Sequence, residues 1–397
     1  MGIRKSALPR IGVSVRRLRT AVIGTGFMGR VHLEALRRVE FVDVAAIAGR
    51  ELGPAEKLGA RYGVETAVDD YRKLLDDATI DAVHICTPNA THYQMAKDAL
   101  LAGKHVLCEK PLSISVEEAE DLVNLAQERS LRNCVCHNLR YYPMVQQMRR
   151  MREDGDLGEV LVVQGTYSQD WLLYETDWNW RIDAKAGGAL RAMGDIGSHW
   201  FDMAEHLTGL RVRSLCADLQ TFHSTRKRPK QSIETFGGKL LTAADVEDTP
   251  VHTEDFGAVL FRMGDHARGA MTASQVSAGR KNHLSIEIYG TKSSVSWNQE
   301  RPDELWIGQR NSPNQVIVKD PSLLKKAAAG YADLPGGHSE GYDDTFKQIF
   351  RRFYTSIAEP HSPPEYPQMA DGLRQMRIME AELASHRNRS WVDLPNN

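Results

Sequence analysis

A glycine-rich turn near the start of the chain constrains the fold more than any other feature. Gly24, Gly26 and Gly29 form a GxGxxG pattern that follows the apolar run at 19–23 and precedes a helical pattern. In such a turn the first glycine permits the tight bend, the second lets the backbone approach a pyrophosphate, and the third lets helix and strand pack closely. The helix N-terminus then offers amide donors to the phosphates. The sequence therefore predicts a Rossmann unit that binds a nicotinamide dinucleotide.

Strand and helix patterns alternate from this turn to residue 138. We predict strands at 19–23, 42–48, 82–86, 105–108 and 131–137, and helices at 29–38, 54–61, 71–75, 92–102 and 115–128. Such alternation is typical of a doubly wound parallel sheet with helices on both faces. We therefore place an α/β dinucleotide-binding domain at 18–138.

A basic segment, 1–17, precedes this domain, and we expect it to be a disordered leader. Its Arg16-Arg17 pair is compatible with an export signal, but such a signal needs an apolar stretch before its cleavage site. Here the arginines run directly into the first strand. The five cysteines, an odd number, do not suggest a disulfide framework. We therefore expect a cytoplasmic protein.

Longer strand patterns dominate after residue 139. They stand at 160–169, 212–223, 251–263, 267–277 and 283–297, with a short one at 391–394, and helical patterns stand at 141–152, 342–354 and 367–387. We predict an α+β domain at 139–397 with a large, mostly antiparallel open sheet, whose last helix packs back on the Rossmann domain. The polar stretch 224–250 is predicted to be a solvated loop, with a phosphate-binding patch at the basic residues 226–230 as the alternative.

Bulk composition argues against several partners. A net charge of −2 gives no electrostatic reason to expect nucleic acid or an anionic membrane. No run approaches the roughly 20 apolar residues of a membrane helix. Cys134, Cys136 and His137 suggest a metal cluster, but strand alternation places His137 on the opposite face from both cysteines. Because no second cluster completes a ligand set, we expect core cysteines and no metal site.

Polar residues follow several strands of the predicted parallel sheet, where ligands of open α/β sheets bind. Residues 86–92 follow one strand, Glu109-Lys110-Pro111 follows the next, and Asn138, expected to face the nicotinamide, follows the last. With the glycine turn, these segments supply the predicted cofactor contacts: Gly24, Gly26, Phe27, Met28, Gly29, Arg50, Thr87, Asn89, His92, Glu109, Lys110 and Asn138.

The end of the second strand bears on the choice between NAD and NADP. An NAD site usually has Asp or Glu there for the ribose hydroxyls. This strand instead ends in Ala48-Gly49-Arg50, and Asp43 lies at its other end. The Arg50 guanidinium suits a 2′-phosphate or the adenine face, with a solvated loop charge as the alternative. We therefore favour NADP over NAD.

A further glycine-rich segment, 187–199, lies in the second domain and ends in Asp195-Ile196-Gly197-Ser198-His199. On a helix, Asp195 and His199 are four residues apart and share one face. The glycine turn, the Glu109-Lys110-Pro111 segment and this DxGxH segment, in this order, resemble the Gfo/Idh/MocA family of oxidoreductases. The resemblance extends from Gly24 to the last helix.

The resemblance implies that Lys110, Asp195 and His199 are catalytic and that the open-sheet domain often forms the interface of a homo-oligomer, here a homodimer or homotetramer. In one departure from the family pattern, residues 191–194 lengthen the segment before Asp195, so we expect an altered pocket floor.

The chemistry of alcohol oxidation assigns a role to each of these side chains. A proton must leave the hydroxyl while hydride leaves carbon, and His199 suits this task because imidazole titrates near neutrality. Lys110 is expected to stabilise the developing alkoxide, and Asp195 to orient the substrate. Lys110 as the base, with its pKa depressed by burial, is the alternative.

Further substrate contacts are predicted beside this segment, at Arg140, Trp180, Arg181 and His338. Tryptophan faces stack on sugar rings, although core packing is the alternative for at least two of Trp171, Trp178 and Trp180, and a structural ion pair is the alternative for Arg140. We predict an NAD(P)-dependent dehydrogenase or reductase of a secondary hydroxyl of a sugar, glycoside or cyclitol, with pyranoside C3 as a candidate position. Redox-neutral, NAD-dependent cleavage of a glycosidic bond and non-enzymatic dinucleotide sensing are the rival functions.

Overall fold

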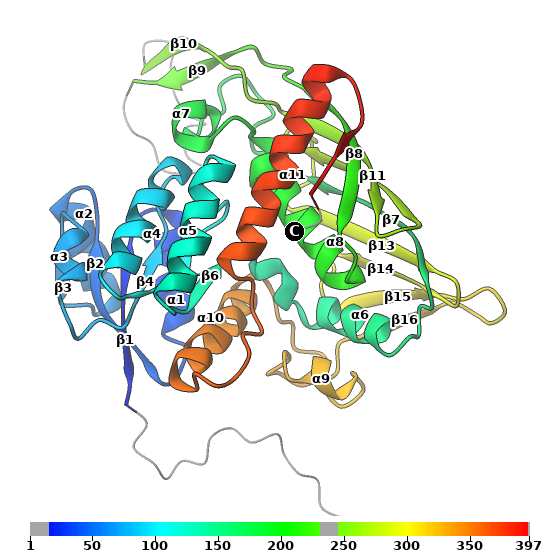
Figure 1. The fold of residues 1–397 in the computed structure, drawn as a ribbon, viewed down its shortest axis with the longest axis horizontal. Coiled ribbons are helices and arrows are strands. Elements are labelled where there is room, and N and C mark those ends of the chain that lie inside the picture. The colour runs from blue at the N-terminus through cyan, green and yellow to red at the C-terminus, as the bar shows by residue number, and fades with distance from the viewer. Residues whose placement is uncertain (1–15, 231–244, 396–397) are drawn as a thin grey trace, which may run out of the picture.

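Two sheets lie on either side of a layer of helices in the computed structural model, which describes residues 16–230 and 245–395. Figure 1 shows the smaller sheet on the left, the larger one on the right and helix α11 (Met369–Asn388) between them. The expectation of a disordered leader falls almost entirely on residues outside the described ranges.

The smaller sheet is the predicted Rossmann sheet, with six parallel strands in the order β3-β2-β1-β4-β5-β6. Its strands are β1 (Leu18–Ile23), β2 (Val42–Ala48), β3 (Thr66–Val68), β4 (Ala82–Ile85), β5 (His105–Cys108) and β6 (Asn133–Val135). Its helices are α1 (Phe27–Leu36), α2 (Leu52–Tyr62), α3 (Arg72–Leu75), α4 (His92–Leu101) and α5 (Val116–Glu128). The short edge strand β3 was not predicted.

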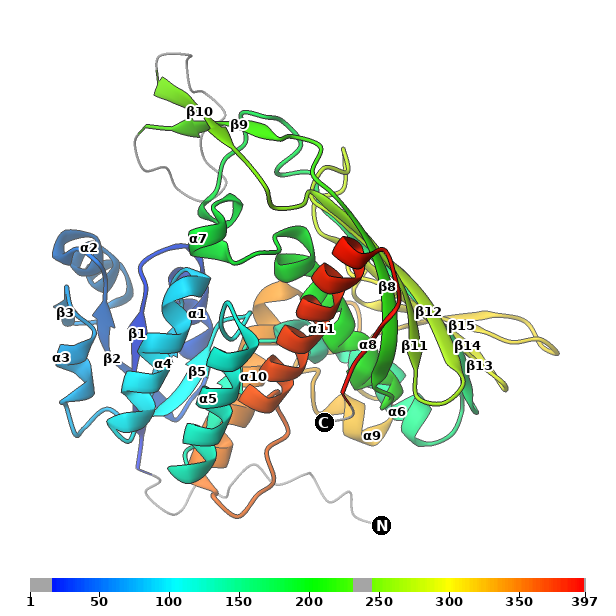
Figure 2. The ribbon, with the colours of Figure 1, turned by 45° about the horizontal axis from the view of Figure 1, so that its top comes forward.

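The larger sheet has nine strands in the order β16-β15-β14-β13-β7-β12-β11-β8-β17, antiparallel except where β7 and β12 run parallel. These strands are β7 (Val160–Ser168), β8 (Val212–Gln220), β11 (Phe256–Met263), β12 (Ala267–Ser274), β13 (His283–Gly290), β14 (Ser294–Asn298), β15 (Glu304–Gly308), β16 (Gln315–Val318) and β17 (Val392–Asp393). Figure 2 shows α8 (Ser198–Thr208) and α11 on the face toward the Rossmann domain. The predicted two-part architecture is confirmed.

The helix layer joins the two parts. Helix α11 contacts both α5 and β8, and its Arg377 pairs with Glu120 of α5. Helix α10 (Tyr342–Ala358) packs against α1 and contributes Phe346, Phe350 and Phe353 to the apolar cluster of the Rossmann domain. Helix α10 therefore belongs to the Rossmann layers in space, although it lies far beyond residue 138 in the chain. The remaining helices are α6 (Pro143–Glu153), α7 (Ala184–Gly187) and α9 (Lys326–Ala329).

Two predictions in the second domain were wrong. Residues 283–297 form two strands, β13 and β14, because the chain turns at 290–293 and the strands pair with each other. The solvated loop predicted at 224–250 is wrong for the described residues at its two ends, since β9 (Thr225–Pro229) and β10 (Val246–Pro250) pair in a two-stranded sheet. For 231–244 the prediction lies outside the described residues. Arg226 is fully buried against Asp255 rather than exposed as part of a phosphate patch.

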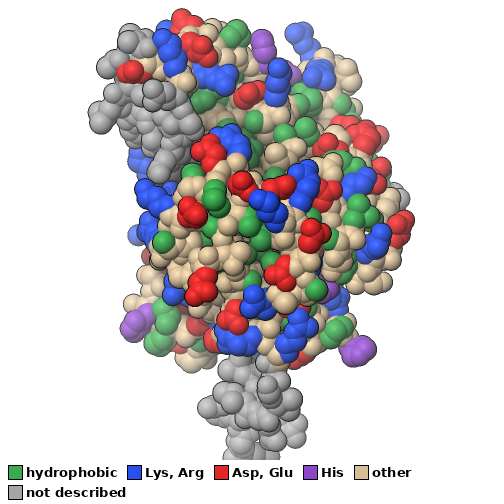
Figure 3. All heavy atoms as spheres, turned by 90° about the vertical axis from the view of Figure 1, so that its left-hand side faces the viewer, with side chains coloured by type: hydrophobic (Ala, Val, Ile, Leu, Met, Phe, Trp, Pro, Cys, Tyr) green, Lys and Arg blue, Asp and Glu red, His purple; other side chains and the backbone are tan. Residues whose placement is uncertain are grey.

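Two observations bear on the surface and on the helices that the structure describes. Over the Rossmann helices, basic and acidic side chains are interspersed rather than gathered by sign (Figure 3). Among the described helices, none has the length and hydropathy needed to cross a membrane.

Candidate active site

One large cavity of about 1060 Å³ lies where the two domains meet. Its Rossmann side is formed by the glycine turn and the loops after β2, β4, β5 and β6, and its other side by residues of the second domain. Fourteen of the predicted site residues line it: Gly24, Gly26, Phe27, Met28, Arg50, Thr87, Asn89, Glu109, Lys110, Asn138, Trp180, Arg181, Asp195 and His199.

The glycine turn has the geometry that a pyrophosphate site needs. Gly24 has a φ of +118°, which strongly favours glycine, and a Cβ on Gly29 would stand 2.0 Å from the Gly24 carbonyl oxygen. A Cβ on Gly26 would meet no atom within 4 Å and would project into open space at the cavity wall. Gly26 is also the N-cap of α1 and brings no capping side chain. The turn therefore fits the phosphates of a dinucleotide.

Two predicted cofactor residues stand behind the cavity wall. Gly29 is hidden beneath Gly24, as its packing role requires. His92 is buried, and its two ring nitrogens lie 2.8 Å from the Pro111 carbonyl oxygen and 2.9 Å from that of Thr87. His92 therefore joins the loops after β4 and β5 and does not reach the cavity itself.

The loops after β4 and β6 are held by distant segments. Asn89 donates to the Gly187 carbonyl oxygen over 2.8 Å, which ties the cofactor side of the cavity to the second domain. Asn138 donates to Thr345 Oγ1 of α10, also over 2.8 Å. These bonds fix the amide side chains that line the cavity and leave their remaining polar groups for a ligand.

Lys110 and Asp195 form the centre of the site. Lys110 Nζ lies 2.7 Å from Asp195 Oδ1 and 2.7 Å from the Asp195 carbonyl oxygen. Arg181 Nε donates to the same Oδ1 over 3.0 Å. Burial raises the pKa of Asp195, but Arg181 and Lys110 lower it, and the net shift places this pKa well below its usual range. The Asp195 carboxylate is therefore ionised and bridges two cations.

His199 faces the same cavity from the other end of the DxGxH segment. Its ring is buried, lies near His137 and Tyr167, and has no hydrogen-bond partner at Nδ1 among the described residues. Burial lowers the pKa of His199 well below 6.5, and the Lys110 ammonium and His137 add to this effect. The imidazole is therefore neutral at pH 7 and able to accept a proton.

The backbone beneath Asp195 and His199 differs from the predicted α-helix. Met193–Gly197 forms a π-helical turn, in which the Ser198 N–H bonds to the carbonyl five residues before it, and α8 continues from Ser198. Such turns recur at functional sites. Both side chains nevertheless line the same cavity.

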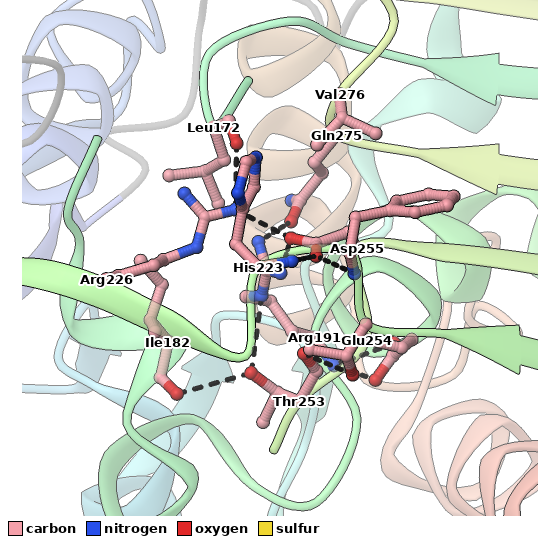
Figure 4. A network of polar contacts seen from close by, with 12 residues as sticks. Leu172, Ile182, Arg191, His223, Arg226, Thr253, Glu254, Asp255, Gln275 and Val276 are labelled. Atoms are coloured by element: carbon pink, nitrogen blue, oxygen red, sulfur yellow. Dashed lines mark hydrogen bonds and ion pairs between the residues drawn. The ribbon is translucent and has the colours of Figure 1, made fainter. Parts of the chain in front are cut away.

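A buried polar network holds this turn in place (Figure 4). Glu254 accepts the N–H groups of Arg191 and Met193. Asp255 pairs with both Arg191 and Arg226, and all three side chains are completely buried. Arg191 also donates to Gln275 Oε1, whose amide nitrogen donates to Asp195 Oδ2 over 3.0 Å. The segment at 191–194 is therefore an anchor for the Asp195 carboxylate.

Two predicted substrate residues lie away from the cavity lining. Arg140 is held by Asp202 and Asp371, so the ion-pair alternative describes it. His338 is exposed on its loop, and its carbonyl accepts from Lys319. Neither side chain is among those that line the cavity.

Several cavity residues were not predicted. Tyr167 and Gln169 donate to Asn282 Oδ1, and the Trp171 indole donates to Gln169. These hydrogen-bonded side chains form a polar wall at the second-domain end of the cavity. Tyr342 and Phe346 reach the cavity from α10. Trp171 is among the tryptophans that can stack on a sugar, but no sequence pattern indicates Tyr167, Gln169 and Asn282, because strand patterns do not show which strand end meets the cavity.

The lowered pKa of His199 has a measurable consequence. In alcohol oxidation, the acid limb of the kcat/KM profile should lie below pH 6.5, because the free enzyme keeps His199 neutral down to that range. Lys110, His137, Asp195 and Tyr167 are the titratable groups around it. His199→Gln should remove this limb together with most activity, whereas His338→Gln should leave the profile unchanged. An acid limb centred above pH 6.5 would contradict the assignment.

The site geometry defines a dinucleotide-dependent oxidoreductase, and comparisons with known proteins agree. A family described as "Oxidoreductase family, NAD-binding Rossmann fold" matches residues 18–137, and the "GFO/IDH/MocA C-terminal domain" matches 145–296. The chain is 30% identical to levoglucosan dehydrogenase of Pseudarthrobacter phenanthrenivorans, over 96% of this chain and 99% of the relative. It is 32% identical to inositol 2-dehydrogenase of Rhizobium meliloti, over 73% and 78% of the two chains.

A solved structure shares the whole architecture. Levoglucosan dehydrogenase in complex with NADH and L-sorbose superposes with a TM-score of 0.86 at 29% identity, covering 96% of this chain and 99% of that one. The chain belongs to the Gfo/Idh/MocA family, so the resemblance is confirmed and the chain is an NAD-binding oxidoreductase.

Proposed function

We propose that this enzyme oxidises a secondary hydroxyl of a sugar, glycoside or cyclitol, with pyranoside C3 as a candidate position. The observation that carries the proposal is the Lys110–Asp195 pair beside His199, at the junction between the glycine turn and the polar, aromatic end of one cavity. Relatives named for levoglucosan and inositol support this substrate class.

The side chains divide the chemistry among them. A bound nicotinamide dinucleotide supplies the hydride acceptor or donor at the Rossmann side of the cavity. His199, neutral at pH 7, accepts the hydroxyl proton, and the Lys110 ammonium stabilises negative charge that develops on the oxygen. Asp195 holds Lys110 and accepts a hydrogen bond from a neighbouring substrate hydroxyl. Trp180, which stacks on Arg181, lies at the substrate end.

A panel of sugars and cyclitols, assayed with NAD and with NADP, tests the proposed function. We expect reduced cofactor to form with at least one neutral pyranose or cyclitol. Absence of turnover across the panel with either cofactor would contradict the dehydrogenase proposal. Release of an aglycone without net cofactor reduction would favour the redox-neutral reaction instead.

The charges around the cavity favour an uncharged substrate. Three cationic side chains line its second-domain and central part, and each lies beside a carboxylate: Lys110 and Arg181 pair with Asp195, and Lys281 pairs with Asp170. Among the described lining residues of this part, none is a cation without such a neighbour. We therefore propose neutral sugars over sugar phosphates, and a matched assay of glucose and glucose 6-phosphate separates the two.

Arg50 supports a preference for NADP. Its side chain is 89% exposed at the cavity edge, with Glu51 3.7 Å away as an exposed neighbour. If Arg50 binds a 2′-phosphate, Arg50→Ala should raise KM for NADP by about 10- to 100-fold, the value of a hydrogen-bonded charge pair. KM for NAD should stay within about twofold. Arg61→Ala, an exposed arginine of α2 outside the cavity, is the control. Equal effects on both cofactors would contradict the preference.

We further propose a homodimer or homotetramer in the cytoplasm. The sheet face that α8 and α11 leave uncovered exposes Val162, Leu260, Val316 and Val318, which supports association through this face. The five cysteines are free thiols, which suits a reducing compartment. Light scattering measures the mass in solution.

A further inference from the structure

A chain of buried side chains crosses the Rossmann domain and ends at the cavity. The Tyr354 hydroxyl of α10 lies 2.8 Å from His84 Nε2 on β4. His84 Nδ1 lies 2.9 Å from His32 Nδ1 on α1, and His32 Nε2 lies 2.9 Å from Glu109 Oε1. Tyr354, His84 and His32 are fully buried, and Glu109 lines the cavity beside Lys110. Three secondary-structure elements thus converge on one carboxylate.

When both imidazole rings are neutral and Glu109 is ionised, proton counting gives this chain a single direction. A carboxylate only accepts, so His32 Nε2 must carry a hydrogen toward an ionised Glu109. A neutral His32 then has a lone pair at Nδ1 and must accept from His84 Nδ1–H. A neutral His84 in turn has a lone pair at Nε2, which the Tyr354 hydroxyl satisfies. Every bond is made with uncharged rings.

The opposite direction fails at the cavity end. It would turn the lone pair of His32 Nε2 toward Glu109 and so require a proton on the carboxyl group. Burial lowers the pKa of His84, and burial raises the pKa of Tyr354, so both groups stay neutral. Burial raises the pKa of Glu109, but the hydrogen bond from His32 and the electrostatic effects of His32 and Lys110 together outweigh burial, so the net shift of this pKa is downward.

We propose that Tyr354, His84 and His32 are positioning residues that hold Glu109 ionised and fixed beside Lys110. The second oxygen of Glu109 accepts the Lys110 N–H over 3.2 Å, so the carboxylate also orients the backbone of the catalytic lysine. The consequence for turnover rests on the proposed function, whereas the proton arrangement does not.

A metal ion is the competing occupant of this region. His32, Glu109 and Cys136 bring three possible ligand atoms within 4.8 Å of one another. A metal would need a lone pair at His32 Nε2. In the proposed chain this nitrogen carries a hydrogen that it donates to Glu109, so no lone pair is free for a metal. The titratable groups around Glu109 are His32, Cys86, His92, Cys108, Lys110, Cys134, Cys136 and Tyr342.

Nitrogen NMR of the full-length protein labelled with ¹⁵N-histidine tests the arrangement directly. Solid-state spectra distinguish the two neutral tautomers and the imidazolium, and His32→Gln and His84→Asn assign the signals. We expect His84 protonated at Nδ1 and His32 at Nε2. An imidazolium at either position near pH 7, the reverse tautomers, or stoichiometric zinc by elemental analysis would overturn the proposal. This result holds whether or not a sugar substrate is found.

Matched variants test the effect on catalysis. Tyr354→Phe removes the first donor, far from the cavity, and leaves the lone pair of His84 Nε2 without a hydrogen-bond partner. This loss should weaken the chain, raise the pH of the acid limb and lower kcat/KM by about tenfold. Tyr366→Phe is the control, because Tyr366 is buried in the same apolar cluster and bonds to Ser356 outside the chain. His32→Gln, which keeps an N–H toward Glu109, should retain more activity than His32→Leu. Equal losses in these two variants, or a Tyr354→Phe profile that matches that of Tyr366→Phe, would overturn the proposal.

Discussion

Replacement of Lys110 by methionine should lower kcat by about 10²- to 10³-fold, which is the usual loss of kcat when one hydrogen-bond donor to a developing oxyanion is removed. Methionine keeps much of the side-chain volume and removes only the ammonium group. Asp195 would retain its bonds from Arg181 and Gln275, so no buried carboxylate is left without a donor. We therefore expect the fold to survive, and the NADH dissociation constant, measured separately, distinguishes a loss of chemistry from a loss of cofactor binding.

The same variant should also change the pH profile. The Lys110 ammonium helps to lower the pKa of His199, so its removal should move the acid limb of kcat/KM to higher pH. Lys97→Met is a matched control, since Lys97 pairs with Asp121 on the Rossmann surface, outside the cavity. Kinetics over a pH series and a fluorescence titration with NADH provide the measurements. A Lys110→Met enzyme with more than a tenth of the original kcat would contradict the role of Lys110.

The cofactor half of the site was predictable because its signals are local. The GxGxxG turn, the strand before it and the helix after it lie within about twenty residues of chain. The carboxyl ends of parallel strands meet at one edge of a sheet, so the positions of Thr87, Glu109 and Asn138 followed from the strand pattern alone. The structure places all three in the cavity wall.

The second half of the site depends on pairings between distant segments. Gln275 reaches Asp195 across 80 residues of sequence, and Asp255 reaches Arg191 across 64. Hydrophobic periodicity assigns elements and faces, but it contains no information on which polar side chains meet in the interior. Helix α10 illustrates the same limit, because its apolar face fits either domain until the chain is folded.

Arg226 shows why the basic composition of 226–230 gave a wrong prediction of its environment. Five consecutive residues that include four cations suggest a solvated surface. In the folded chain, strand alternation turns Arg226 inward, where Asp255 and the carbonyl oxygens of Leu172 and Tyr174 accept from its guanidinium. A buried partner 29 residues away therefore decides the environment of this arginine.

Asp255 is therefore the residue whose loss should cost the most stability. Its Oδ1 accepts from Arg191 and Arg226, and its Oδ2 accepts the N–H groups of Phe222 and His223. Asp255→Asn keeps the shape of the side chain but leaves the guanidinium groups of Arg191 and Arg226 buried without a counter-anion. The new amide NH₂ also points toward groups that donate hydrogen bonds and cannot accept one. Loss of one partner of a buried ion pair costs about 3–5 kcal/mol. We expect a decrease of this size in the free energy of unfolding.

Denaturant unfolding at one protein concentration measures this loss, with Asp248→Asn as the control. Asp248 pairs with Lys227 on the exposed side of the β9–β10 hairpin, so its variant should change the free energy of unfolding by less than about 1 kcal/mol. The pKa of Asp255 is lowered, because Arg191 and its hydrogen bonds outweigh burial. The stabilisation from Asp255 is therefore present at neutral pH and is lost as pH falls below the ordinary carboxyl value of about 4. The gap between wild type and Asp255→Asn should narrow below that pH, whereas a gap independent of pH would show that the charge of Asp255 is not what the network needs.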